Sequence, residues 1–275
     1  MKFKRSERLV EMTAVFIQNP MRIYALEEFV DRFDVAKSSI SEDITIIRDV
    51  LASRGLGELR TYSGARGGVQ FLPAASSSAT RHKMKALCEE LNQSERLLPG
   101  GYIYTSDILS NPHWLKMIGR IIASQYINRD IDAIITIATK GIPIAQAVSM
   151  ALNIPYVIVR KASKVTEGST VGINYLPRSS SHDMERMELA TRSLKRESRV
   201  MIIDDFLRGG GTLKGLNMIA QEFDCEVVDS VVLVEYMTVP EELDISYRSL
   251  FKIRSIDSET GRIEVTVGNL LKNDK

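Results

Sequence analysis

The chain has 275 residues, of which 44% are hydrophobic and 26% charged, a composition typical of a soluble protein with one large core or two unequal ones. Its formal net charge of +1 gives no overall attraction to nucleic acid, so any such contact has to come from a local patch. Two distant cysteines, Cys88 and Cys225, indicate neither a disulfide framework nor a zinc site, and no apolar run approaches the ~20 residues that span a bilayer, so we expect a cytoplasmic protein without a membrane segment.

The sequence of the N-terminal part predicts three helices followed by a hairpin. Apolar residues at steps of three and four predict helices over 5–17, 24–33 and 37–53, and the third repeats Ile40, Ile44, Ile47 and Leu51. Two short strands, 58–62 and 69–72, flank a glycine-rich turn that contains Arg66. This order is that of a winged helix.

A small-residue run over 73–80 marks the domain boundary, so we expect domains at 1–74 and 75–275. Behind it, apolar strands alternate with helices, which predicts an α/β fold with a doubly wound parallel sheet and a ligand beyond the carboxyl ends of its strands. The expected strands are 131–138, 156–159, 200–203 and 227–234, and the expected helices are 142–152 and 212–223.

The most informative segment, 200–212, is an apolar strand, two adjacent carboxylates and a glycine loop that opens a helix. Gly209, Gly210 and Gly211 allow main-chain N–H groups to converge on a phosphate, to which the Thr212 hydroxyl adds a donor. The ionised Asp204 and Asp205 suit a ribose diol, because both accept hydrogen bonds from hydroxyls. The competing interpretation is a metal-binding or solvated strand end followed by an ordinary turn.

This segment resembles the phosphoribosyl pyrophosphate (PRPP) motif of type I phosphoribosyltransferases. Residues 138–143 resemble the family's pyrophosphate loop, Arg160 and Lys161 its second pyrophosphate contact, and 164–177 its mobile hairpin. The resemblance implies that PRPP is held by three groups of residues, usually with Mg²⁺ and without a metal bound directly by the protein. They are Asp204 and Asp205 for the ribose; Arg208, Gly209, Gly210, Gly211 and Thr212 for the 5′-phosphate; and Thr139, Lys140, Gly141 and Lys161 for the pyrophosphate.

One position departs from the hypoxanthine-guanine enzymes of that family. Arg208 stands where they carry an Asp near the base, and an arginine cannot accept a proton at neutral pH. Xanthine phosphoribosyltransferases lack that Asp as well, so the substitution alone does not exclude catalysis. Tyr102 and Phe206 are candidates to stack on a guanine or other purine nucleotide that competes with PRPP, with core packing as the alternative role.

Taken whole, the chain resembles the purine operon repressors of Gram-positive bacteria. The resemblance implies a PRPP sensor without catalytic residues that leaves operator DNA when PRPP binds, and a symmetric homodimer. The alternatives are an active purine phosphoribosyltransferase with an accessory DNA-binding domain, and a winged helix that binds only other proteins.

For the DNA contact we expect the start of the third helix to enter the major groove and the wing tip to reach the minor groove or backbone. The N-terminal Lys2, Lys4, Arg5 and Arg8 are candidates for phosphate contacts. A plain helix cap is an equally good explanation for Ser38 and Ser39. The candidate DNA-binding residues are Lys37, Ser38, Ser39, Ser41, Glu42, Thr45, Arg48 and Arg66.

Overall fold

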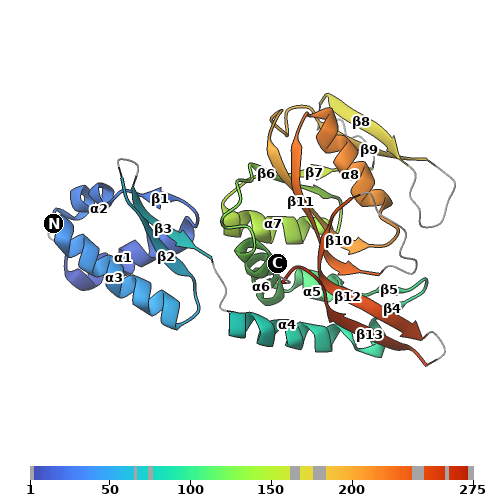
Figure 1. The fold of residues 1–275 in the computed structure, drawn as a ribbon, viewed down its shortest axis with the longest axis horizontal. Helices are drawn as coiled ribbons and strands as arrows, with labels where there is room; N and C mark the ends of the chain where they lie inside the picture. The colour runs from blue at the N-terminus through green and yellow to red at the C-terminus, as the bar shows by residue number, and fades with distance from the viewer. Residues whose placement is uncertain are drawn as a thin grey trace. The chain divides into compact units, whose positions relative to one another are not determined.

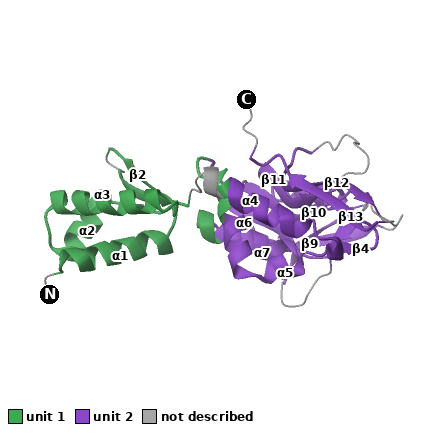
Figure 2. Ribbon diagram, turned by 90° about the horizontal axis from the view of Figure 1, so that it is seen from below, with its two compact units in different colours: residues 1–80, 120–128, 150–153 green, residues 81–119, 129–149, 154–275 purple. Residues whose placement is uncertain are grey.

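A computed structural model describes residues 3–64, 67–73, 77–161, 168–175, 184–236, 245–257 and 260–271. The chain divides into two compact units (Figure 2). One comprises residues 1–80, 120–128 and 150–153, and the other comprises 81–119, 129–149 and 154–275. No helix among the described residues is long and apolar enough to cross a membrane.

The first unit contains the predicted winged helix (Figure 1). Strand β3 lies between β1 and β2 and pairs antiparallel with both. Its elements in chain order are α1 (Arg5–Gln18), β1 (Ile23–Tyr24), α2 (Leu26–Phe33), α3 (Lys37–Ser53), β2 (Glu58–Tyr62) and β3 (Gly68–Leu72).

The helix expected over 24–33 begins later than its apolar pattern suggests. Tyr24 belongs to a short strand whose partner in β3 is Val69, and α2 starts at Leu26. The Tyr24 ring is buried against Phe16 and Phe29, at centroid distances of 5.7 and 5.6 Å. Tertiary packing and strand pairing thus override the local helical spacing at this position.

A six-stranded sheet forms the centre of the second unit, in the order β13-β12-β11-β10-β6-β7 (Figure 1). All its pairs are parallel except that of β12 with β13 at one edge. This confirms the doubly wound α/β class, with an antiparallel strand added at the edge. The strands are β6 (Ala133–Ile137), β7 (Tyr156–Val159), β10 (Arg199–Leu207), β11 (Glu226–Glu235), β12 (Arg248–Asp257) and β13 (Arg262–Val267).

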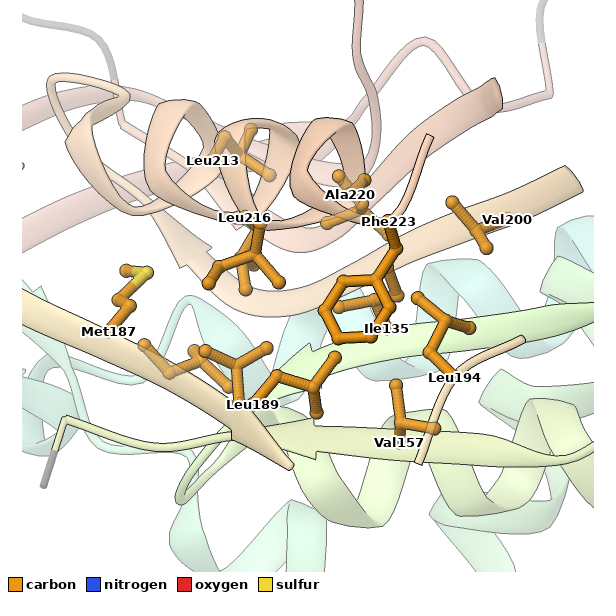
Figure 3. Packing of buried hydrophobic residues seen from close by; sticks show 14 of the residues in the cluster. Ile135, Val157, Met187, Leu189, Leu194, Val200, Leu213, Leu216, Ala220 and Phe223 are labelled. Atoms are coloured by element: carbon orange, nitrogen blue, oxygen red, sulfur yellow. The ribbon is translucent and has the colours of Figure 1, made fainter. Parts of the chain in front are cut away.

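Apolar side chains of helix α8 pack onto this sheet. Figure 3 shows Leu216 of α8 and Phe223, the residue directly after this helix, pointing toward Ile135 of β6 and Val157 of β7, and all four are buried. Met187 and Leu189, from the hairpin of β8 and β9, join the same cluster. The helix and the hairpin are therefore fixed to the sheet by one apolar core.

The structure has further helices and two short hairpins besides this sheet. Strands β4 and β5 form one two-stranded sheet, and β8 and β9 form another. These elements are α4 (Ser77–Leu91), η1 (Ser94–Arg96), β4 (Leu97–Leu98), β5 (Tyr102–Ile103), α5 (Ser106–Ser110), α6 (Pro112–Ser124), α7 (Gly141–Leu152), β8 (Thr170–Tyr175), β9 (Glu185–Ala190) and α8 (Gly211–Glu222). The hairpin expected over 164–177 lies partly outside the described residues.

Candidate functional site

A pocket of about 610 Å³ lies at the carboxyl ends of β6, β7 and β10 in the second unit. This is the position at which open α/β sheets bind ligands. Its lining combines carboxylates, lysines, an arginine and aromatic rings. The lining residues are Leu98, Pro99, Tyr102, Ile103, Ile137, Lys140, Lys161, Tyr175, Glu185, Asp204, Asp205, Phe206, Arg208 and Thr212.

The adjacent carboxylates lie within β10, which is longer than the expected strand 200–203. Asp204 is only 4% exposed, and Oδ1 of Asp204 accepts a 2.9 Å hydrogen bond from the Asp205 N–H. Burial raises the pKa of Asp204 well above its usual value, and the Asp205 carboxyl adds to this. Burial also raises the pKa of Asp205, and this effect outweighs the hydrogen bond with Asp204 and the positive charge of Lys140, which both lower it. Two partly desolvated acceptors side by side suit a hydroxyl-rich ligand.

The glycine loop follows β10 directly and opens α8. Gly209 and Gly210 have φ of 72° and 75°, a left-handed conformation that a side chain would strain. Gly210 is the N-terminal cap of α8, and its carbonyl accepts a 3.0 Å hydrogen bond from the Lys214 N–H. The N–H groups at the start of this helix, with the Thr212 hydroxyl nearby, are suited to bind an anion.

The predicted pyrophosphate loop connects β6 to α7. Lys140 lines the pocket, whereas Thr139 and Gly141 do not. The Ala138–Thr139 peptide bond is cis. A Cβ on Gly141 would lie 2.3 Å from Oγ1 of Thr136 and 3.4 Å from Oδ1 of Asp204. Only glycine therefore allows the start of α7 to approach β6 and β10 this closely.

Lys161 has two neighbours in the pocket that the sequence did not single out. Its Nζ lies 2.5 Å from Oε2 of Glu185, and the Tyr175 hydroxyl donates a 2.5 Å hydrogen bond to the same oxygen. Hydrogen bonds from Lys161 and Tyr175 lower the pKa of Glu185, while burial, followed by the bond to Glu185, raises the pKa of Tyr175. Glu185 and Tyr175 have no local motif, because only the pairing of β8 with β9 brings them together.

The segment 97–103, called the strap below, supplies another wall of the pocket. Tyr102 packs against Phe206 at a centroid distance of 5.4 Å and remains 42% exposed. The Arg208 guanidinium lies 5.2 Å from the Tyr102 ring and donates a hydrogen bond to the carbonyl of Gly100. In this arrangement Arg208 contacts the strap, and the Tyr102 ring stays accessible for stacking.

The donor set fits a magnesium ion that is held mainly by a ligand. No group of three or more His, Cys, Asp or Glu within the described part of the chain could hold a metal ion. Mg²⁺ commonly uses one or two carboxylates together with phosphate oxygens. Asp204 and Asp205 could provide such carboxylates beside a bound pyrophosphate.

The candidate DNA-reading residues lie at or after the start of α3, and most are exposed. Lys37 forms a 2.5 Å ion pair with Glu27, and Glu42 forms a 3.3 Å pair with Arg5. Lys37, Ser38, Ser41, Glu42 and Thr45 are exposed, whereas Ser39 is half-buried. Arg66 lies outside the described residues, as does Lys2.

Besides Lys37, three more of the candidate basic residues have partners inside the first unit. Arg48 donates to the Leu59 carbonyl at 3.0 Å and to the Thr61 hydroxyl at 2.7 Å. Arg5 and Arg8 both bind Asp43, which is fully buried. These contacts join α1 to α3 and α3 to β2, so they serve the fold whether or not the same residues reach DNA.

Two family models match this chain. That of the N-terminal domain of the bacterial purine repressor matches residues 4–73, and that of the phosphoribosyl transferase domain matches residues 105–267. An adenine phosphoribosyltransferase from Thermoanaerobacter pseudethanolicus has a TM-score of 0.53 at 18% identity, covering 61% of this chain and 98% of that one. This likeness concerns the fold of the second unit.

Relatives of full length are considerably closer in sequence. The probable purine biosynthesis transcriptional regulator PurR of Streptococcus pneumoniae is 46% identical over 100% of both chains. The purine biosynthesis transcriptional repressor PurR of Bacillus subtilis is 44% identical over 99% of this chain and 95% of its own. The purine biosynthesis transcriptional activator PurR of Lactococcus lactis is 43% identical over 99% of this chain and 100% of its own. The chain therefore belongs to the bacterial purine repressor family.

Proposed function

We propose that this chain is a cytoplasmic transcriptional repressor of purine biosynthesis genes that binds operator DNA through its winged helix and leaves the DNA when PRPP binds. The pair of Asp204, which is buried, and Asp205, which is half-buried, carries the proposal, because it supplies acceptors for a ribose diol next to donors for a phosphate. The full-length relatives, which are named as transcriptional regulators, support the regulatory role.

In this proposal each part of PRPP has a matching part of the pocket. Asp204 and Asp205 accept from the ribose hydroxyls, and the 208–212 loop donates to the 5′-phosphate. Lys140 and Lys161 line the pocket as cations for the pyrophosphate, with main-chain donors from Thr139 to Gly141. Bound Mg²⁺ would neutralise part of the pyrophosphate charge.

Ligand and operator are coupled reciprocally in the same proposal. If PRPP lowers the affinity for DNA by some factor, DNA lowers the affinity for PRPP by the same factor.

A homodimer would present two recognition helices to the two half-sites of an operator. Domains at 1–74 and 75–275 would then divide DNA reading from effector binding. A purine nucleotide stacked on Tyr102 and Phe206 would compete with PRPP.

The test is fluorescence anisotropy with the chain's own purine-gene promoter, with and without PRPP and Mg²⁺. PRPP is expected to weaken DNA binding by wild type and to leave the Asp204→Ala/Asp205→Ala variant unaffected. DNA binding that PRPP does not change would contradict the sensor role. In vitro transcription from the same promoter then fixes the direction, since a repressor lowers the transcript level and an activator, the name given to the Lactococcus relative, raises it.

The second candidate is an active purine phosphoribosyltransferase, favoured by the match to the transferase domain. It requires release of pyrophosphate when purine bases, PRPP and Mg²⁺ are supplied. Turnover that disappears in Asp204→Ala would establish it and would rule out a purely sensory pocket.

A further inference from the structure

Glu185 has an unusual position for a residue in a pocket proposed to bind a polyanion. Its carboxylate lines the pocket, and the contacts of its Oε2 are the Lys161 ammonium and the Tyr175 hydroxyl, each at 2.5 Å. Lys161 is one of the cations available to a pyrophosphate. In the free pocket, therefore, the Glu185 carboxylate is paired with the Lys161 ammonium that a bound pyrophosphate would use.

The main chain holds Glu185 in this place. Tyr175, at the end of β8, is the register partner of Glu185, at the start of β9. Three residues further along β9, Glu188 exchanges two main-chain hydrogen bonds with Arg160, at 2.9 and 2.8 Å. Arg160 directly precedes Lys161. The Glu185–Lys161 pair is thus set by strand pairing, in contrast to two long side chains that meet by chance on a surface.

The charge of Glu185 is also settled by its partners. Hydrogen bonds from Lys161 and Tyr175 lower its pKa, so the carboxylate is ionised at neutral pH. The Glu185 side chain is 33% exposed and that of Lys161 is 55% exposed, so water and an incoming anion can reach the pair. An exposed pair of this kind is weak enough to be exchanged for a stronger partner.

We propose that Glu185 is a built-in competitor for the pyrophosphate of the effector: it occupies Lys161 in the free pocket, and the ligand has to displace it. The inference rests on the proposed PRPP site and adds a residue that limits its affinity. Displacement frees the Lys161 ammonium to bind phosphate oxygens and leaves Tyr175 without its acceptor. The end of the β8–β9 hairpin thereby changes its contacts when ligand binds.

A carboxylate beside a pyrophosphate has one obvious alternative role, as a ligand of the magnesium ion. The two roles predict opposite changes in pyrophosphate affinity when Glu185 is replaced. Removing a competitor strengthens binding of pyrophosphate, whereas removing a metal ligand weakens it. Glu185→Gln separates them, because glutamine has the same shape, can still accept from Tyr175 and carries no charge.

The experiment is isothermal titration calorimetry of the full-length chain with inorganic pyrophosphate and, separately, with PRPP, both with Mg²⁺. Glu185→Gln is expected to bind pyrophosphate about three- to tenfold more tightly than wild type. The matched control is Glu226→Gln. Glu226 lies at the start of β11, does not line the pocket, and forms an ion pair with Arg199. This control is expected to bind as wild type does.

A double-mutant cycle with Lys161→Met assigns the effect to the pair. If Glu185 acts by occupying Lys161, most of the gain from Glu185→Gln disappears in the Lys161→Met background. Equal or weaker pyrophosphate binding by Glu185→Gln, or a gain that persists in full without Lys161, overturns the proposal. If wild type binds pyrophosphate but not PRPP, the proposed function is contradicted and the role of Glu185 is not. If wild type binds neither probe, the proposed function and the role of Glu185 are both contradicted.

Discussion

Asp204 and Asp205 are adjacent in β10, and the Asp205 N–H donates a 2.9 Å hydrogen bond to Oδ1 of Asp204. The pocket thus contains two neighbouring carboxyls, and burial raises the pKa of each. A raised pKa means that the folded chain holds protons which the unfolded chain releases. The contribution of this pair to the unfolding free energy is therefore fully present below the usual pKa of 3.8. It is lost as the pH rises through the raised pKa values of the folded chain.

Asp204→Asn should consequently stabilise the chain at neutral pH while it removes the PRPP response. Asparagine keeps an acceptor for the Asp205 N–H and does not bury a charge, so we expect a gain of roughly 1–2 kcal/mol in unfolding free energy. Thermal melting at about pH 8 and pH 4 measures it, and the gain should shrink at the lower pH. Asp130→Asn, which changes a 97% exposed carboxylate, is the control and should leave the melting temperature unchanged. A loss of stability at pH 8 in Asp204→Asn would contradict this account.

Gly141→Ala should distort the loop between β6 and α7. The new Cβ would lie 2.3 Å from Oγ1 of Thr136, a buried hydroxyl that has no hydrogen-bond partner among the residues that the structure describes. We expect a loss of about 1–3 kcal/mol in unfolding free energy, as for other overpacked sites, together with weaker PRPP binding. Denaturant unfolding and calorimetry measure the two effects.

The rescue variant for this site is Gly141→Ala combined with Thr136→Ala. Removing the Thr136 hydroxyl and methyl takes away the nearest contact of the new Cβ, so the double variant should be more stable than the two single losses predict. Strict additivity of the two changes would show that the clash with Thr136 is not the cause.

Much of this molecule could be predicted where the signal is local. The step of three and four residues along 37–53 predicted the bounds of α3, and the apolar run 156–159 predicted those of β7. The motif at Asp204 to Thr212 located the pocket because strand, carboxylates, glycine loop and helix are consecutive in sequence. A ligand site built on one βα connection leaves its full pattern in a short segment.

The rest of the pocket depends on contacts between distant segments. Glu185 and Tyr175 are ten residues apart and meet only through the register of β8 with β9. The strap has strands of two residues, too short for an alternating pattern. Similarly, the helical face of Arg48 could be predicted, but its hydrogen bonds to Leu59 and Thr61 of β2 could not.

Arg48 and Thr45 should separate folding from DNA reading on α3. Arg48→Ala removes the two hydrogen bonds to β2, so we expect a loss of about 1 kcal/mol in the unfolding free energy as well as weaker DNA binding. Thr45 is exposed and its hydroxyl donates a 3.0 Å hydrogen bond to the Ser41 carbonyl of the same helix, so Thr45→Ala should change stability by less than about 0.5 kcal/mol. If Thr45 reads a base edge, that variant loses roughly 1–3 kcal/mol of operator affinity. Chemical denaturation and anisotropy distinguish the two, and unchanged operator affinity in Thr45→Ala would exclude it from the interface.

Arg96 and Asp107 should control the strap. The buried Arg96 makes two 2.8 Å hydrogen bonds to Asp107 and one of 3.0 Å to the Tyr104 carbonyl. These bonds fix both ends of the segment that carries Tyr102. Asp107→Asn should therefore loosen this wall of the pocket and weaken binding of GMP, used as the probe for the stacking site, by about two- to fivefold.

The pH dependence provides an independent check on the same pair. Hydrogen bonds from Arg96 lower the pKa of Asp107, so the stabilisation is present above the usual pKa of 3.8 and is lost as the pH falls through the lowered value. Wild type should thus be more stable than Asp107→Asn at pH 7, by at most ~1 kcal/mol since Asp107 is exposed, and the difference should shrink as the pH falls below 3.8. GMP binding that is unchanged in Asp107→Asn while stability falls would show that Arg96 holds the fold without positioning Tyr102. Weaker GMP binding with an unchanged affinity for inorganic pyrophosphate would confine its influence to the strap, because Lys140 and Lys161 lie on other elements of the pocket.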